Sequence, residues 1–220
     1  MGLKESITKL PGIETAMNCA TKLIKGDDKN ESAINTLMMW AVDMVNTNIP
    51  IPGLDQADEL ANKYMNKPGK TLEQKVDALI KAQLVKCGVF STVTGVPGFA
   101  ALPLNLVGTV YIQVCTVAAI ARMGGYDAND DKVKLAIVAC FAGGSAMEKI
   151  GEMIATKAAQ QAAKRSVLKV IPGIGAIVAG TVDVITTKAI CSAAKKMFID
   201  TKPNSFIIMW QKTPTSIGGG

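Results

Sequence analysis

The side chains best suited to chemistry in this sequence are serines, lysines, carboxylates and cysteines, because the chain contains no histidine. The segment GGSAM around Ser145 approaches the G-x-S-x-G turn that exposes a catalytic serine, but Met147 occupies the last glycine position. Without an imidazole base there is no His-based triad, and the usual zinc and iron ligand sets are incomplete. Catalysis through lysine, aspartate or serine stays open, although no motif points to it.

Two sequence patterns resemble a nucleotide site and a calcium site but lack essential residues of each motif. The glycine-rich run GIGAIVAGTV lacks the phosphate-loop lysine, since Thr181 follows Gly180. Asp127, with Asn129 and Asp131, resembles the start of a calcium loop, yet Lys132 replaces its glycine and Val138 its bidentate glutamate. We expect instead that Asn129, Asp130 or Asp131 caps a helix beginning near Lys132. We therefore expect no metal and no cofactor.

A pair of carboxylates at helical spacing also falls short of a metal site. Glu148 and Glu152 share one helix face, but Lys149 and Lys157 lie near them in sequence. No histidine completes a carboxylate-bridged metal site, so a solvated face is the better interpretation.

Basic residues are concentrated in the last third of the chain. The net charge is +6, and residues 157–220 hold nine Lys/Arg and only two Asp/Glu. We predict two helices, apolar on one side and basic on the other, with an apolar stripe over Val178, Val182, Ile185, Ala189 and Met197. The basic residues expected to bind an anionic membrane surface or a partner are Lys157, Lys164, Arg165, Lys169, Lys188, Lys195 and Lys196. An ordinary solvated face is the alternative, and nucleic acid is not expected because aromatic interleaving is sparse.

The elements that must position these residues are helices. Apolar residues make up 49% of the chain and aromatic residues only 5%. Helical periodicity recurs from Ile34 to Val45 and from Leu72 to Cys87, and Thr71 with Gln74 has the form of a capping box. We expect an all-α fold, a single compact bundle of about seven or eight helices over residues 1–200 with apolar central hairpins and an extended tail over 201–220.

Long uncharged runs raise the question of a membrane. No charged side chain occurs from Cys87 to Ala121, but Pro97, Gly98 and Pro103 would interrupt one long helix. The run from Leu104 to Ala121 is marginal for a bilayer span of about 20 residues. The runs 135–147 and 170–182 are shorter still. We interpret all three as buried core helices and keep membrane insertion as the alternative.

A set of ordered motifs resembles the EcsC family. The first has the form GxPGxxxLPxxL and is followed by YxQ, IA and GYD; VIPGIGAIVAG and AAKKMF follow downstream, so that the resemblance spans roughly residues 72–200. Its residues, read as structural, are Gly95, Pro97, Gly98, Pro103, Gln113, Gly125, Tyr126, Asp127, Pro172, Gly175 and Gly180. The resemblance implies an all-helical, cytoplasmic or membrane-peripheral domain, and it implies no catalytic residues.

The two ends add weaker signals. The N-terminus lacks the apolar stretch of a secretory signal, so we expect a cytoplasmic protein, and Met1, Gly2 and Ser6 fit a myristoylation signal. The five scattered cysteines indicate buried thiols in a reducing compartment. The segment SFIIMW is too apolar for a free tail, and we expect Phe206, Ile207, Ile208 and Trp210 to dock on the body or a partner.

Our interpretation is a non-enzymatic helical binding protein at an anionic membrane surface. The alternative is a soluble assembly protein, in which the apolar helices and SFIIMW form interfaces with a protein partner or in a homo-oligomer.

Overall fold

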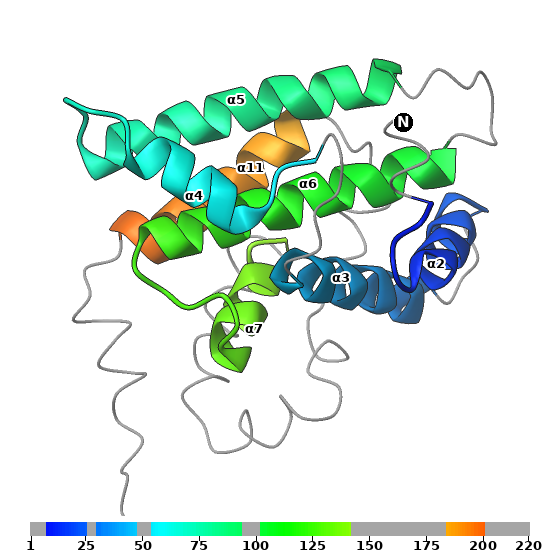
Figure 1. The fold of residues 1–220 in the computed structure, drawn as a ribbon. Coiled ribbons are helices and arrows are strands. Elements are labelled where there is room, and N and C mark those ends of the chain that lie inside the picture. Colours follow the sequence, from blue (N-terminus) through cyan, green and yellow to red (C-terminus); the bar gives the residue numbers. More distant parts are fainter. Residues whose placement is uncertain (1–7, 26–29, 48–53, 94–101, 142–183, 201–220) are drawn as a thin grey trace, which may run out of the picture.

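The computed structural model describes residues 8–25, 30–47, 54–93, 102–141 and 184–200, and every regular element in these ranges is helical (Figure 1). The elements are α2 (Ile13–Lys25), α3 (Asn30–Asn46), α4 (Ala57–Met65), α5 (Leu72–Val93), α6 (Leu102–Met123), α7 (Asp131–Ala139), α11 (Val184–Lys195) and the π-helical turn η3 (Lys196–Asp200). The predicted all-α bundle is confirmed for this part of the chain. The predicted tail, residues 201–220, lies outside it.

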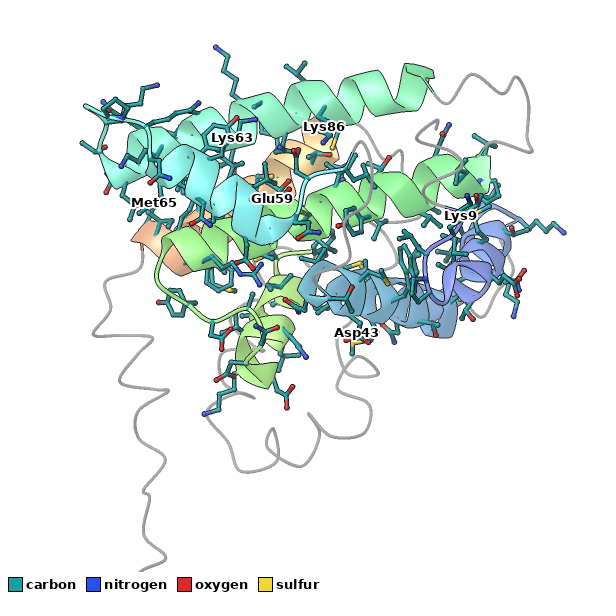
Figure 2. All side chains as sticks on the ribbon, viewed as in Figure 1. Lys9, Asp43, Glu59, Lys63, Met65 and Lys86 are labelled. Atoms are coloured by element: carbon teal, nitrogen blue, oxygen red, sulfur yellow. The ribbon has the colours of Figure 1, made fainter. Side chains whose placement is uncertain are left out.

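Helix α6 is the centre of the bundle. It contacts every other described helix, with α4, α5 and α11 on one side and α2, α3 and α7 on the other (Figure 1). Charged side chains such as Lys9, Asp43 and Lys63 point away from the bundle (Figure 2). In the described part, α6 is the one helix long and apolar enough to cross a membrane, and 94% of its apolar window is buried inside the protein. The core interpretation of Leu104–Ala121 is therefore confirmed.

Helix starts follow local capping signals. The Thr71 backbone N–H donates to Gln74 Oε1 at 3.1 Å, and the Gln74 N–H donates to Thr71 Oγ1 at 3.3 Å, so the predicted capping box forms at the start of α5. Asp130 caps α7, since its side chain accepts a hydrogen bond from the Lys132 N–H at 2.7 Å. Of the three predicted cap residues, Asn129, Asp130 and Asp131, Asp130 is therefore the N-cap of α7.

The start of α6 agrees with the expected interruption of the uncharged stretch. Helix α5 ends at Val93 and α6 begins at Leu102, with Pro103 in its first turn. Proline fits this position because the first amides of a helix have no intrahelical acceptor, so its missing N–H costs nothing there. Pro103 therefore suits the first turn of α6, one residue after the helix begins.

The end of α6 explains three residues of the GYD motif. Gly125 has φ +86°, and the N–H groups of Gly125 and Tyr126 donate to the carbonyls of Arg122 and Ala121 at 2.9 and 3.0 Å. This pairing is a Schellman cap, which favours glycine in the left-handed position. The Tyr126 ring stacks edge-on against Phe198 of η3, with centroids 5.4 Å apart. Asp127 Oδ1 accepts the Asn129 N–H at 2.9 Å and closes the turn into α7.

Candidate binding surface

The described part of the basic third is α11 with η3. Lys188 and Lys195 lie on α11, and Lys196 begins η3. Lys157, Lys164, Arg165 and Lys169 lie outside the described residues, as do the motif residues Gly95, Pro97, Gly98, Pro172, Gly175 and Gly180 and the tail residues Phe206, Ile207, Ile208 and Trp210. The predicted sites among these residues remain predictions.

The orientation of α11 differs from the predicted one. Ile185 is 77% exposed and Ala189 is also exposed, so these two members of the predicted apolar stripe face outward, whereas Met197 is buried as expected. The buried side of the helix consists of Thr187, Ile190, Cys191 and Ala194. Because small and apolar residues occur all around α11, helical periodicity alone did not identify its buried face.

A buried hydrogen bond determines which face of α11 turns inward. Gln113 Nε2 in the middle of α6 donates to Thr187 Oγ1 at 2.8 Å, and both side chains are almost fully buried. Unpaired polar groups are costly in such surroundings, so α11 must keep Thr187 opposite Gln113. Gln113, placed in the YxQ motif by the sequence, thereby orients α11 on the core.

The face of α11 that remains outward combines basic and apolar side chains. Its exposed residues, continued into the first residue of η3, are Ile185, Lys188, Ala189, Ser192 and Lys196. Residues on successive turns of this set are three or four positions apart, so they share one side of the helix. Helix α11 contains no acidic residue in its first turn, and Asp183 precedes it outside the described range. We call these five residues the α11 outward face.

Lys195 is held at the edge of this face. Its Nζ lies 2.5 Å from Asp77 Oδ1 on α5, and the Lys195 side chain is only 23% exposed. The same lysine helps to lower the pKa of Glu73, after the larger effects of hydrogen bonds from the Glu73 backbone amide and Thr71. The charge of Lys195 is thus already paired with a carboxylate of the same chain.

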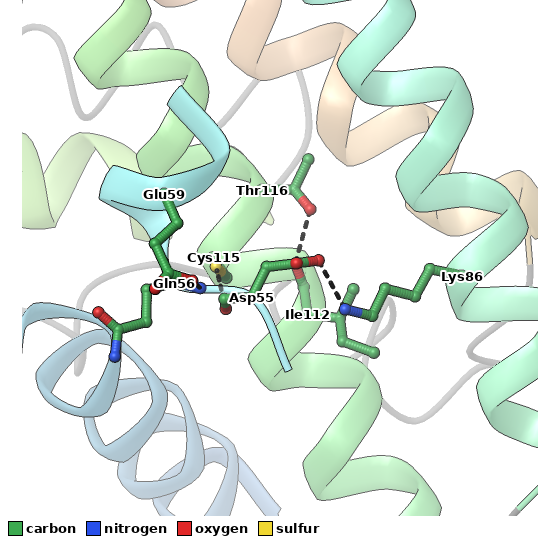
Figure 3. Close-up of polar contacts among 7 residues, drawn as sticks. All are labelled: Asp55, Gln56, Glu59, Lys86, Ile112, Cys115 and Thr116. Atoms are coloured by element: carbon green, nitrogen blue, oxygen red, sulfur yellow. Dashed lines mark hydrogen bonds and ion pairs between the residues drawn. The ribbon is translucent and has the colours of Figure 1, made fainter. Parts of the chain in front are cut away.

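A second polar cluster joins α4 to α5 and α6 (Figure 3). Lys86 Nζ lies 2.6 Å from Asp55 Oδ2, and Cys115 Sγ donates to the Asp55 carbonyl oxygen at 3.1 Å. In the first turn of α4, Asp58 forms a further pair, because its Oδ1 lies 2.7 Å from Arg122 Nε. Sequence reasoning missed these pairs because their partners are far apart along the chain, so no local spacing signalled them.

This cluster holds helices together and is unsuited to nucleophilic chemistry. Burial is the largest cause that raises the pKa of the Cys115 thiol, and the Asp55 carboxylate raises it further, so the thiol stays protonated. Burial likewise raises the pKa of Cys87 to about 11 and that of Cys191 to about 12. Cys19 and Cys140 are buried too, as expected for structural cysteines.

Ligand-binding features are weak elsewhere in the described ranges. No group of three or more Cys, Asp or Glu residues there is arranged to hold a metal ion. A hollow of about 460 Å³ beside α2 is lined by Thr8, Ile13, Glu14, Met17 and Asn18, so Glu14 is the one ionisable side chain among these residues. Among the described residues that line the hollow, no second ionisable group accompanies Glu14, so they do not supply the acid–base pair of a catalytic site. The α11 outward face is therefore the better candidate for function.

Comparison with models of protein families, with curated proteins and with solved structures finds no match to this chain.

Proposed function

We propose that the protein is a non-enzymatic helical binding protein that associates peripherally with the anionic cytoplasmic face of a membrane through the α11 outward face. The observation that supports this most is the position of Ile185, which is 77% exposed on the same face as Lys188 and Lys196. An apolar side chain flanked by lysines suits the boundary between acyl chains and anionic headgroups. An EcsC-like domain is part of the same proposal.

The expected strength of this contact is modest. Each lysine near an anionic surface contributes about 1 kcal/mol. Burial of a side chain such as Ile185 contributes about 1.5–3 kcal/mol. The contributions of Lys188, Lys196 and Ile185 therefore correspond to weak and reversible binding. The additional basic residues proposed to share this role, Lys157 to Lys169, would strengthen it.

Co-flotation with liposomes tests the proposal. The full chain is mixed with vesicles of phosphatidylcholine alone or with phosphatidylserine added, at low and high salt. We expect flotation only with the anionic lipid, and less of it at high salt because exposed charges are screened. The proposal would be contradicted if the protein floated only with neutral vesicles, or if it floated with no vesicles at either salt concentration.

A matched pair of variants locates the surface. The double variant Lys188→Glu/Lys196→Glu reverses two charges on the α11 outward face, whereas Lys22→Glu/Lys25→Glu makes the same charge change on exposed residues of α2, on the other side of α6. Losing two lysine contacts of about 1 kcal/mol each weakens binding at least about thirtyfold. We expect this loss in the first variant alone. Equal losses in both would mean that net charge, and not this face, governs binding.

A soluble assembly protein is the second candidate function. Its support is that Val85 on α5 is 64% exposed and Ile185 is 77% exposed, since exposed aliphatic side chains also suit a subunit interface. Sedimentation velocity without lipid distinguishes the two functions. A defined oligomer that dissociates in Val85→Ser or Ile185→Ser and ignores vesicles would favour assembly.

A further inference from the structure

The connection between α4 and α5 places three lysines around an exposed methionine. Lys63 and Lys70 are exposed and Lys67 is partly exposed, while Met65 is 40% exposed at the last residue of α4. Figure 2 shows Lys63 and Met65 at the end of α4 that leads into this connection. We call Lys63, Met65, Lys67 and Lys70 the lysine corner.

The lysine corner is held by contacts within the chain. Lys75 Nζ donates to the Met65 carbonyl oxygen at 2.7 Å, and Lys67 Nζ lies 4.0 Å from the centroid of the Tyr64 ring. Gly69 has φ +68°, which lets the chain turn into the capping box of α5. Because these contacts are already made, binding at the corner requires little additional ordering of the backbone.

Two carboxylates on α4 and α5 have partners outside the lysine corner. Asp58 in the first turn of α4 pairs with Arg122, and Asp77 on α5 pairs with Lys195. Among the described residues, none of Lys63, Lys67 and Lys70 forms an ion pair within 4.0 Å. Their positive charge is therefore not neutralised by direct pairing within the described part of the chain.

The corner also lies close to the C-terminal end of α11. Lys75 reaches back to Met65, and two residues further along α5 Asp77 holds Lys195. The end of α4, the start of α5 and the end of α11 therefore meet at one end of the bundle (Figure 1).

We infer that the lysine corner is a second contact with the anionic lipid surface, and that it fixes the orientation in which α11 lies on the membrane. This inference rests on the proposed function. Lipid is the occupant that the chemistry favours: an exposed apolar side chain with lysines nearby in the chain can place Met65 among acyl chains while the lysine stems extend to the headgroups. The corner has no arginine for bidentate phosphate contacts, and its one aromatic side chain, Tyr64, is buried, so nucleic acid fits less well.

Vesicle affinity of the full chain tests this inference. The variants are Lys67→Glu/Lys70→Glu and, for the apolar tip, Met65→Ser, with Lys22→Glu/Lys25→Glu as the charge-matched control. We expect the corner double variant to bind phosphatidylserine vesicles at least about thirtyfold more weakly, because it loses two lysine contacts of about 1 kcal/mol each. We expect Met65→Ser to weaken binding without changing its salt dependence. Thermal unfolding followed by circular dichroism checks that each variant keeps its fold.

The outcomes separate the two proposals. If Lys188→Glu/Lys196→Glu loses vesicle binding while the corner variants bind like the wild-type protein, the lysine corner is not a contact and the proposed function stands. If the corner variants bind an acidic polyglutamate peptide less well but bind vesicles normally, the corner serves a protein partner and the inference is wrong. If the wild-type chain binds no anionic vesicle, both proposals fail.

Discussion

Gly124 gives a sharp test of the contact that seats η3 on the end of α6. A Cβ atom added at this position would lie 2.4 Å from the Phe198 carbonyl oxygen, which is backbone and cannot move without η3. Overpacking of this kind costs about 1–3 kcal/mol. If η3 shifts, the edge-on contact between Phe198 and Tyr126 weakens as well, at about 0.5–1.5 kcal/mol. We therefore expect Gly124→Ala to lower the free energy of unfolding by about 1.5–4.5 kcal/mol.

Urea denaturation of the full chain, followed by far-ultraviolet circular dichroism, measures this change. Gly125→Ala is the control: its φ of +86° strains alanine, but no atom lies within 4 Å of the added Cβ, so we expect only about 1–2 kcal/mol from the backbone. The Gly124 backbone is not in the left-handed region, so without the contact alanine would stabilise the protein by about 0.4–1 kcal/mol. A stabilised Gly124→Ala variant would refute the seating of η3 on α6.

Three further results are expected. Either Gln113→Leu or Thr187→Val alone strands a buried polar partner and costs about 1–3 kcal/mol, whereas the double variant costs less than their sum in a denaturation cycle. The pKa of the Cys87 thiol is raised to about 11, so we expect this thiol to resist Ellman's reagent at pH 8 until the chain unfolds. The contribution of the protonated thiol to the free energy of unfolding is present below the ordinary thiol pKa and is lost as pH rises from about 9 toward 11. Urea titrations at several pH values measure this loss. Asp77→Asn releases Lys195 from its partner and strengthens binding to anionic vesicles by up to about fivefold; unchanged binding would place Lys195 away from the lipid.

Features that depend on neighbouring residues were predictable from the sequence. Thr71 and Gln74 form the expected box because both partners lie within one helical turn, and Asp130 caps α7 for the same reason. The buried residues from Ile34 to Val45 follow the 3.6-residue period of α3. Residues Ile13 to Leu23 of α2 show a similar period, which the sequence reasoning did not use.

Features that depend on contacts across the fold were not predictable in the same way. The inward face of α11 is selected by Gln113, which lies 74 residues from Thr187 along the chain. The pairing of Lys195 with Asp77 spans 118 residues, so the basic count of the last third overstated the charge available on α11. The lysine corner was not predicted because residues 1–86 contain equal numbers of acidic and basic side chains. The basic side chains are separated from the acidic ones only in the folded chain.

The most direct test of membrane binding by the α11 outward face is a fluorophore at Ile185. All five native cysteines are buried, so a thiol introduced by Ile185→Cys is labelled selectively with an environment-sensitive dye, with Ile24→Cys on α2 as the control site. We predict a blue shift of the dye emission at position 185, but not at position 24, when phosphatidylserine vesicles are added. No shift at position 185, or equal shifts at both positions, would contradict the proposal that this face lies on the membrane.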